Sequence, residues 1–333
     1  MRIHPRRRGL CVTGLVIAAL AAGAVPGAAQ VPLPTGDALH IKIDPEFATV
    51  SAGARVILRY RYEHDPRPYL QALHTPKGVP LLLEAPTEYA HHRGLMYAAT
   101  VNGVDFWGEA AKVGKIVHQT IHAGNPRMNA GFMQDLEWRS PEGKPLLAEH
   151  RTVWVWGTQP VLDAGAVLFD WRMVLEPAPG VADVELTDDR DAGLGLRIVT
   201  APEQDVHFIT AQTPTSAESQ NATVYAGRWC AYTTNTDGKP VTLALFDHPG
   251  NPWPAAWLAA KAPYARLAAT LKLHEHPAKL KAGESLRLVY GVAAWDGQIE
   301  PAKIESLYQL WLSTSPLRPT SQPASQSATA PAR

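Results

Sequence analysis

The chain has 333 residues, 46% of them hydrophobic, and its 31 basic and 31 acidic side chains cancel in formal charge. The first thirty residues hold four arginines and no Asp or Glu, so the remainder carries 27 basic and 31 acidic residues. This slightly acidic balance excludes the basic surface field that nucleic-acid binding requires.

Residues 1–29 have the pattern of a secretory signal peptide. Four arginines form a basic start, Leu10–Val25 is apolar, and small residues precede a cleavage point near Ala29. We therefore expect export to the periplasm or beyond, and no membrane span in the mature chain. Only Cys230 would remain after cleavage, so the mature monomer would contain no internal disulfide.

Short runs typical of β-strands follow, separated by Pro, Gly, Asn and Asp. In residues 56–62, arginines alternate with Leu58, Tyr60 and Tyr62, as in a strand that is buried on one face. Similar runs occupy residues 151–156, 167–175, 197–199, 241–246 and 285–290. Repeated short strands at this spacing predict an all-β, mainly antiparallel fold, a large β-sandwich.

One segment near the end of the chain has helical periodicity. Its apolar residues stand at i, i+3, i+4 and i+7, and they are Ile304, Leu307, Tyr308 and Trp311. This spacing predicts a C-terminal helix that packs across one end of the sandwich. Residues 30–312 contain no linker, so we expect a single domain. Residues 313–333 are rich in Ser, Pro and Ala and predict a disordered tail.

Residues 91–107 hold the densest polar cluster, with His91, His92 and Arg93 ahead of an apolar run. Neighbouring side chains on a strand point to opposite faces, so the two histidines would do different jobs. One of them could face a cleft as a proton carrier, because imidazole titrates near neutral pH. The alternative is that one histidine ties a loop to backbone carbonyls and the other is solvated.

Two further clusters contain carboxylates. Glu149 and Arg151 share one face of a predicted strand and form either a clamp for a hydroxyl group or a surface ion pair. Asp247, His248 and Asn251 lie in a Pro- and Gly-stiffened loop after a strand, where binding groups are often presented. In the alternative interpretation Asp247 only shapes a turn.

We expect the stretches near positions 91, 149 and 247 to meet at one polar hollow. The predicted catalytic residues are His91, His92, His118, Asp247 and His248. The predicted substrate-binding residues are Arg93, Asn102, Glu149, Arg151, Arg197 and Asn251. No metal site and no cofactor is predicted.

Several motifs, in the same order along the chain, resemble the PmoA-like family of exported bacterial proteins, which carries the label methane oxygenase PmoA. They include residues 67–70, 91–95, 101–107, 114–118, 147–151, 195–197 and 247–252. The resemblance runs from about residue 55 to residue 312. It implies a β-sandwich similar to galactose-mutarotase-like domains, a fold associated with carbohydrate epimerases, lyases and hydrolases.

The leading hypothesis is therefore an exported carbohydrate-active protein that acts on a sugar or glycoside through His and carboxylate acid–base chemistry. Its partner would be a small molecule or an oligosaccharide. A non-enzymatic carbohydrate-binding protein on the same fold is one alternative. A metal-dependent oxygenase, as the family label says, is the other.

Overall fold

The structure is a computed structural model that describes residues 37–84, 87, 91–108, 112–125, 128–187, 193–199, 205–211, 217–219 and 222–314. The chain divides by its internal contacts into two units, Met1–Thr35 and Gly36–Arg333, and the described residues all belong to the second. The predicted signal peptide and the predicted tail beyond residue 314 lie outside the described residues.

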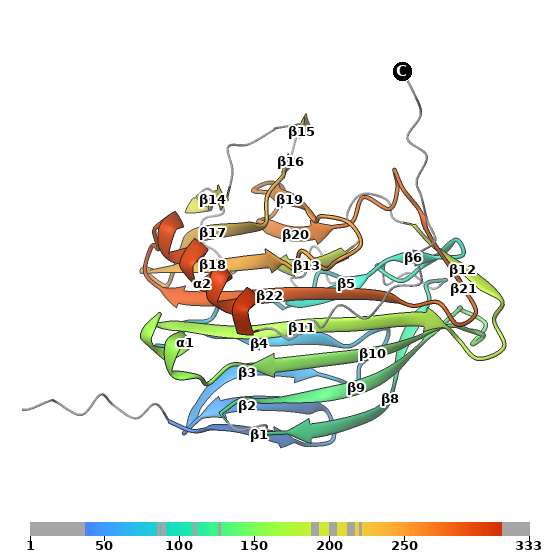
Figure 1. Ribbon diagram of the computed structural model, residues 1–333, viewed down its shortest axis with the longest axis horizontal. Coiled ribbons are helices and arrows are strands. Elements are labelled where there is room, and N and C mark those ends of the chain that lie inside the picture. The colour runs from blue at the N-terminus through green and yellow to red at the C-terminus, as the bar shows by residue number, and fades with distance from the viewer. Residues whose placement is uncertain are drawn as a thin grey trace, which may run out of the picture. The chain divides into compact units, whose positions relative to one another are not determined.

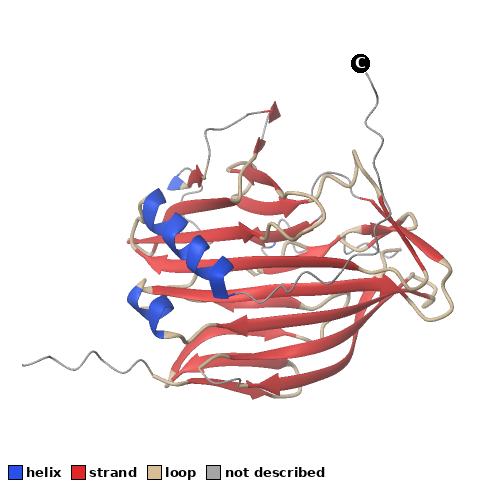
Figure 2. Cartoon of the chain, viewed as in Figure 1, coloured by secondary structure: helices blue, strands red, loops and turns tan. Residues whose placement is uncertain are grey.

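The strands of the described residues form three antiparallel sheets (Figures 1 and 2). The first has ten strands in the order β1 (Leu39–Ile43), β2 (Phe47–Ala52), β3 (Arg55–Arg61), β4 (Tyr69–Leu73), β5 (Leu95–Ala98), β13 (Gly193–Arg197), β20 (Arg266–Thr270), β19 (Ala256–Ala260), β16 (Ala222–Tyr225) and β15 (Ala217–Ser219). The second has eight strands in the order β14 (His207–Thr210), β17 (Trp229–Thr236), β18 (Lys239–Asp247), β22 (Leu286–Asp296), β11 (Ala166–Pro177), β10 (Pro145–Val155), β9 (Ala130–Arg139) and β8 (Lys115–Gly124). The third has four short strands in the order β21 (Ala278–Lys281), β12 (Asp183–Thr187), β6 (Thr100–Val101) and β7 (Val104–Asp105).

The main core lies between the ten-stranded and eight-stranded sheets. Alternate residues of each strand enter it, as the two-residue period of a strand requires. On β3, for example, Leu58 and Tyr60 are fully buried in this core, whereas Arg59 between them is exposed. The predicted all-β sandwich with a C-terminal helix is confirmed.

The helices are α1 (Gln159–Asp163) and α2 (Pro301–Thr314). The four predicted apolar residues of α2 are all buried, in a second core with Leu168, Phe246 and Trp295 of the eight-stranded sheet. Helix α2 therefore covers the outer face of that sheet rather than one end of the sandwich (Figure 1). Asp170 on β11 anchors it, accepting a hydrogen bond of 2.5 Å from the Trp311 indole.

The outer face of the ten-stranded sheet carries the second set of alternating side chains. On β5 and β13, Leu95 and Leu194 enter the main core, whereas Met96 and Gly195 turn away from it. Strand β13 pairs with β5 on one side and β20 on the other, so its last residues lie beside the first residues of both neighbours. Three chain segments far apart in sequence therefore meet on this face.

Candidate functional site

A hollow opens on the outer face of the ten-stranded sheet, over β5, β13, β20 and β19. It has about 310 Å³ of space unoccupied by atoms, part of which is open solvent. Its floor is made of small and apolar residues such as Met96, Gly195 and Ala268. The polar and aromatic side chains that line it are His92, Arg93, Trp107, Arg197 and Arg266. A mostly apolar pocket with a few converging polar groups is typical of a ligand site.

A close approach of β4 to the start of β5 positions the turn that holds His91 and His92. Gly94 has φ +46°, and a Cβ there would lie 1.9 Å from the Leu70 carbonyl oxygen on β4. Only glycine fits this position. His91 and His92 precede it in a turn rather than on a strand, and their ring centroids are 4.3 Å apart. The expectation that they point to opposite faces is therefore wrong.

His92 is the central titratable group of the hollow, and only 6% of its surface is exposed. Its Nε2 lies 2.6 Å from the Tyr264 hydroxyl, which also accepts a hydrogen bond of 3.3 Å from Arg266 Nη1. Burial, with the charges of His91, Arg266 and Arg197 adding to it, lowers the pKa of His92 to about 3. The imidazole is therefore neutral at physiological pH, with one N–H donor and one acceptor nitrogen.

Trp107 stands at the side of the hollow on a firmly held loop. The buried Arg67 guanidinium donates to the carbonyl groups of Phe106, Trp107 and Gly108. The Asp105 carboxylate accepts the Trp107 backbone N–H at 2.6 Å. The indole lies against Gly195, where an added Cβ would come within 3.2 Å of it. A missing side chain on β13 thus makes room for an aromatic ring beside the hollow.

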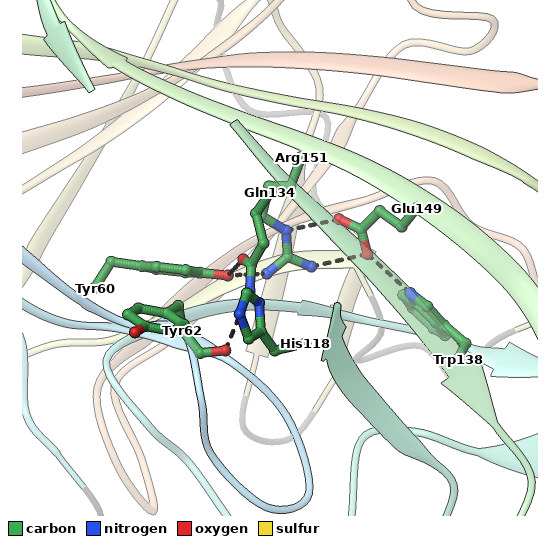
Figure 3. A network of polar contacts seen from close by, with 7 residues as sticks. All are labelled: Tyr60, Tyr62, His118, Gln134, Trp138, Glu149 and Arg151. Atoms are coloured by element: carbon green, nitrogen blue, oxygen red, sulfur yellow. Dashed lines mark hydrogen bonds and ion pairs between the residues drawn. The ribbon is translucent and has the colours of Figure 1, made fainter. Parts of the chain in front are cut away.

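Glu149 and Arg151 lie elsewhere, sealed between the two large sheets (Figure 3). Arg151 donates two hydrogen bonds to Glu149, of 2.6 and 2.9 Å, and one of 2.8 Å to the Tyr60 hydroxyl on the opposite sheet. Trp138 donates to the same carboxylate at 2.8 Å. Burial lowers the pKa of Arg151, but the charges of Glu149 and Tyr60 and the hydrogen bonds to them together outweigh it, so the pKa is raised. Neither residue can reach a substrate, so their predicted substrate-binding role is wrong.

His118 and Asn102 do not join the hollow either. His118 extends the sealed network, with Nδ1 3.1 Å from Gln134 Nε2 and its ring edge-on to Tyr62 (Figure 3). Asn102 forms the turn between β6 and β7, with φ +49°, and its side-chain oxygen accepts the Glu185 N–H at 2.8 Å. Both residues have structural contacts in place of the predicted ligand contacts.

The Asp247 loop is a third, separate place, beyond the end of β18. Asp247 accepts hydrogen bonds from the Asn251 side chain at 2.7 Å and from the Ala255 N–H at 2.9 Å. The Asn251 side chain also donates to the Val289 carbonyl and accepts the Val289 N–H. His248 Nδ1 accepts the Gly250 N–H at 2.9 Å. The turn-shaping alternative describes these contacts. The prediction that three stretches meet at one hollow is wrong, because only the stretch near position 91 reaches it.

Of the predicted residues, the structure brings His92, Arg93 and Arg197 to the hollow and places His91 beside His92. Sequence reasoning missed the contributions of Tyr264 and Arg266. Arg266 does give a signal, because it opens a run of small apolar residues as Arg197 ends one. Tyr264 gives none, since it lies 172 residues from its partner His92.

Two kinds of feature are absent from the described residues. No group of three or more His, Cys, Asp or Glu side chains among them is arranged to hold a metal ion. None of the helices in the described ranges has the length and hydrophobicity needed to cross a membrane.

A family model matches residues 48–309, most of the chain, under the description "Family of unknown function (DUF6807)". The chain belongs to this family. The resemblance to the PmoA-like family is corrected by this match, since the matching family is a different one and its description names no activity. The metal-oxygenase alternative rested on that label and falls with it. No curated protein sequence matches the chain.

Two solved structures similar to this DUF6807 member are galactosidases. A GH36 alpha-galactosidase from Geobacillus stearothermophilus aligns with 78% of this chain and 41% of its own, at 10% identity and a TM-score of 0.47. The galactosidase domain of an alpha-galactosidase-sucrose kinase aligns with 78% of this chain and 42% of its own, at 10% identity and a TM-score of 0.46. This chain thus spans about two fifths of their lengths, and a likeness at this level carries no argument about its ligand.

Proposed function

We propose that this protein is carbohydrate-active and holds a sugar in the outer hollow, with His92 as the polar group that meets its reacting atoms. The observation that carries the proposal is the convergence of His92, Trp107 and Arg197 on one accessible hollow with an apolar floor. An indole face suits the apolar face of a sugar ring, and the polar groups suit its hydroxyls.

The neutral state of His92 defines what it does there. A pKa of about 3 makes the imidazole a weak base at neutral pH. A neutral imidazole instead donates a hydrogen bond to one sugar oxygen, while Tyr264 fixes the orientation of the ring. The predicted partnership of histidine with Asp247 or Glu149 has no place in this arrangement. A hydrolase, lyase or epimerase reaction remains compatible with it.

The test is a screen of mono- and oligosaccharides, with binding followed by calorimetry and products identified by mass spectrometry. We expect His92→Gln to lower turnover by about 100-fold, the usual loss when one hydrogen-bond donor to a reacting oxygen is removed. His122→Gln is the matched control, because His122 is exposed on β8 of the other sheet. It should leave both readouts unchanged.

The outcomes separate the hypotheses. No binding by any sugar, or full turnover by His92→Gln, contradicts the proposal. A sugar that binds tightly and yields no product supports the non-enzymatic carbohydrate-binding alternative instead.

Export is part of the same proposal, supported by the sequence pattern of residues 1–29. Expression in a bacterial host and mass analysis of the periplasmic fraction would test it. A mature chain that begins near Gln30 supports export, and an uncleaved cytoplasmic chain contradicts it.

A further inference from the structure

The outer face of the eight-stranded sheet is only partly covered. The second core, which contains α1 and α2, is built on β11, β17, β18 and β22. None of its described members belongs to β8, β9 or β10, and neither helix crosses these three strands (Figure 1). Their outward residues include Met133 and His150, which are both exposed.

A tryptophan lies low on this surface because two outward strand positions have no side chain. Gly131 on β9 is the register partner of Gly124 on β8 and, on its other side, of Trp154 on β10. A Cβ would come within 2.7 Å of the Trp154 ring at Gly131 and within 2.5 Å of it at Gly124. The indole therefore extends from β10 across β9 to β8, into space that two side chains would otherwise fill.

The needs of folding do not explain this arrangement. Glycine within a strand weakens the strand, because it loses more chain entropy and packs no side chain. Trp154 belongs to neither of the two hydrophobic cores of the described residues, and it remains partly exposed. Two residues beyond Gly131 on β9 stands Met133, with 48% of its surface exposed. Two glycines thus make room for an aromatic ring at the surface, next to an exposed apolar side chain.

Hydrogen-bonding groups continue the surface along the same strands. Thr152 stands between Trp154 and His150 on the outward side of β10. Asp135 on β9 accepts a hydrogen bond of 2.6 Å from Thr120, and its other oxygen lies 2.6 Å from His150 Nδ1. The side chains of His150 and Asp135 are 59% and 47% exposed. From Trp154 to His150 the surface runs for about 13 Å at the rise of a strand, which is longer than one sugar ring.

The size of the apolar part decides which kind of partner it fits. A tryptophan buries at most about 250 Å². A stable protein interface buries about 800 Å² on each partner and has an apolar centre. Trp154 and Met133 together fall well short of that area. A sugar chain has a narrow footprint, and it presents C–H faces to an indole and hydroxyls to polar neighbours.

We propose that Trp154 and Met133, with the polar residues beside them on β9 and β10, form a second carbohydrate-binding surface that holds an extended glycan chain. The indole stacks on one sugar ring, and Thr152, His150 and Asp135 bond to hydroxyls farther along the chain. The surface and the hollow lie on different sheets. The inference therefore goes beyond the proposed function, because it assigns a site that binds sugar without reacting with it.

Affinity electrophoresis of the full chain in gels that contain a soluble neutral polysaccharide tests this surface. The probes are galactomannan, xyloglucan and mixed-linkage glucan. We expect at least one of them to retard the native chain. Trp154→Ala should weaken that retention by roughly tenfold, the effect of losing one aromatic contact. Trp154→Phe keeps a ring and should retain most of the affinity.

Gly124→Ala tests the position of the ring rather than its presence. The added Cβ would lie 2.5 Å from the indole, so the ring must shift. We expect retention to weaken by roughly threefold, with an unchanged circular dichroism spectrum. If Trp154→Ala fails to fold, Gly124→Ala carries the test.

Phe47→Ala is the matched control. Phe47 is a partly exposed ring on β2 of the ten-stranded sheet, and the Arg59 guanidinium already covers its face, with Cζ 3.7 Å from the ring centroid. Its removal should leave the retention by every polysaccharide unchanged.

Each outcome decides one claim. Retention that falls in Trp154→Ala and persists in His92→Gln supports the second surface, whatever reaction the hollow performs. Retention that persists in Trp154→Ala and falls in His92→Gln overturns this inference and leaves the proposed function standing. A native chain that none of the polysaccharides retards also overturns it. So does a dimer, observed by sedimentation, that Trp154→Ala converts to a monomer, because the surface then binds a second copy of the chain.

Discussion

The outer hollow and the sealed network between the sheets are built from the same kinds of residues. One gathers His92, Arg197, Tyr264 and Trp107, and the other gathers His118, Arg151, Tyr60, Glu149 and Trp138 (Figure 3). In the network the donors of Arg151, Trp138 and Tyr60 meet protein acceptors within hydrogen-bond distance. In the hollow the lining side chains face an opening to solvent.

The difference shows that residue type alone does not mark a functional site. A buried ion pair that is fully hydrogen-bonded between two sheets has no capacity for a ligand, whatever chemistry its residues carry elsewhere. The hollow differs from the network because its lining side chains converge on one space that is open to solvent. Variants in the network should therefore affect folding, and variants at the hollow should affect binding.

The largest expected effect comes from breaking the sealed pair. Arg151→Met leaves the Glu149 carboxylate buried without its cation, and we expect a loss of about 3–5 kcal/mol in the free energy of unfolding. Urea denaturation measures it. Arg139→Met, which breaks a pair with Glu137 at the surface, should cost about 1 kcal/mol or less. Equal stability of the two variants would contradict the sealed character of the network.

The next largest effect on stability is expected at Asp247, which lies in the third of the stretches that were predicted to meet at one hollow. Burial raises the pKa of Asp247 from 3.8 to about 6, although hydrogen bonds from Ala255 and Asn251 oppose it. A carboxyl with a raised folded-state pKa contributes stability below its unfolded pKa, and this is lost as pH rises through the folded value. The advantage of the native chain over Asp247→Asn should fall by about 2–3 kcal/mol between about pH 4 and pH 7. A difference in unfolding free energy that does not change with pH would refute this.

A smaller effect is expected from Tyr264→Phe at the hollow. The variant loses the hydroxyl bonded to His92, and we expect a cost of about 0.5–1.5 kcal/mol in unfolding free energy, with a clear drop in sugar affinity. Tyr225→Phe, at a half-buried position on β16 of the same sheet, is the control. A stability loss as large as that of Arg151→Met would assign Tyr264 to structure rather than to the site.

Gly195→Ala should have the smallest effect on stability. Its Cβ would stand 3.2 Å from the Trp107 indole, which is only partly buried and can shift by a few tenths of an ångström. We expect a cost of about 1 kcal/mol or less, at the low end of overpacking penalties. Sugar affinity, measured by calorimetry, should nevertheless fall because the ring moves. Unchanged affinity would remove Trp107 from the binding surface.

Much of the fold was predictable from local pattern. The strand at residues 56–62 and the helix around Leu307 follow from alternation and from the 3.6-residue period, and both are confirmed. His92, Arg93 and Arg197 were also found, because they are polar residues beside apolar runs. Whether a pair of polar residues lies in the interior or at the surface was not predictable. Alternation places Glu149 and Arg151 on one face of β10, but only the packing of the opposite sheet makes that face interior.

The sequence by itself determined the period with which apolar residues recur. From that period follow the strands, the helix and the residues that share a face, because these depend on neighbours a few positions apart. The tertiary structure alone decided which polar residues gather. Arg197 meets Arg266, and Tyr264 meets His92, because β13 is inserted between β5 and β20. That strand order is set by burial summed over the whole sandwich, and no local stretch of sequence contains it.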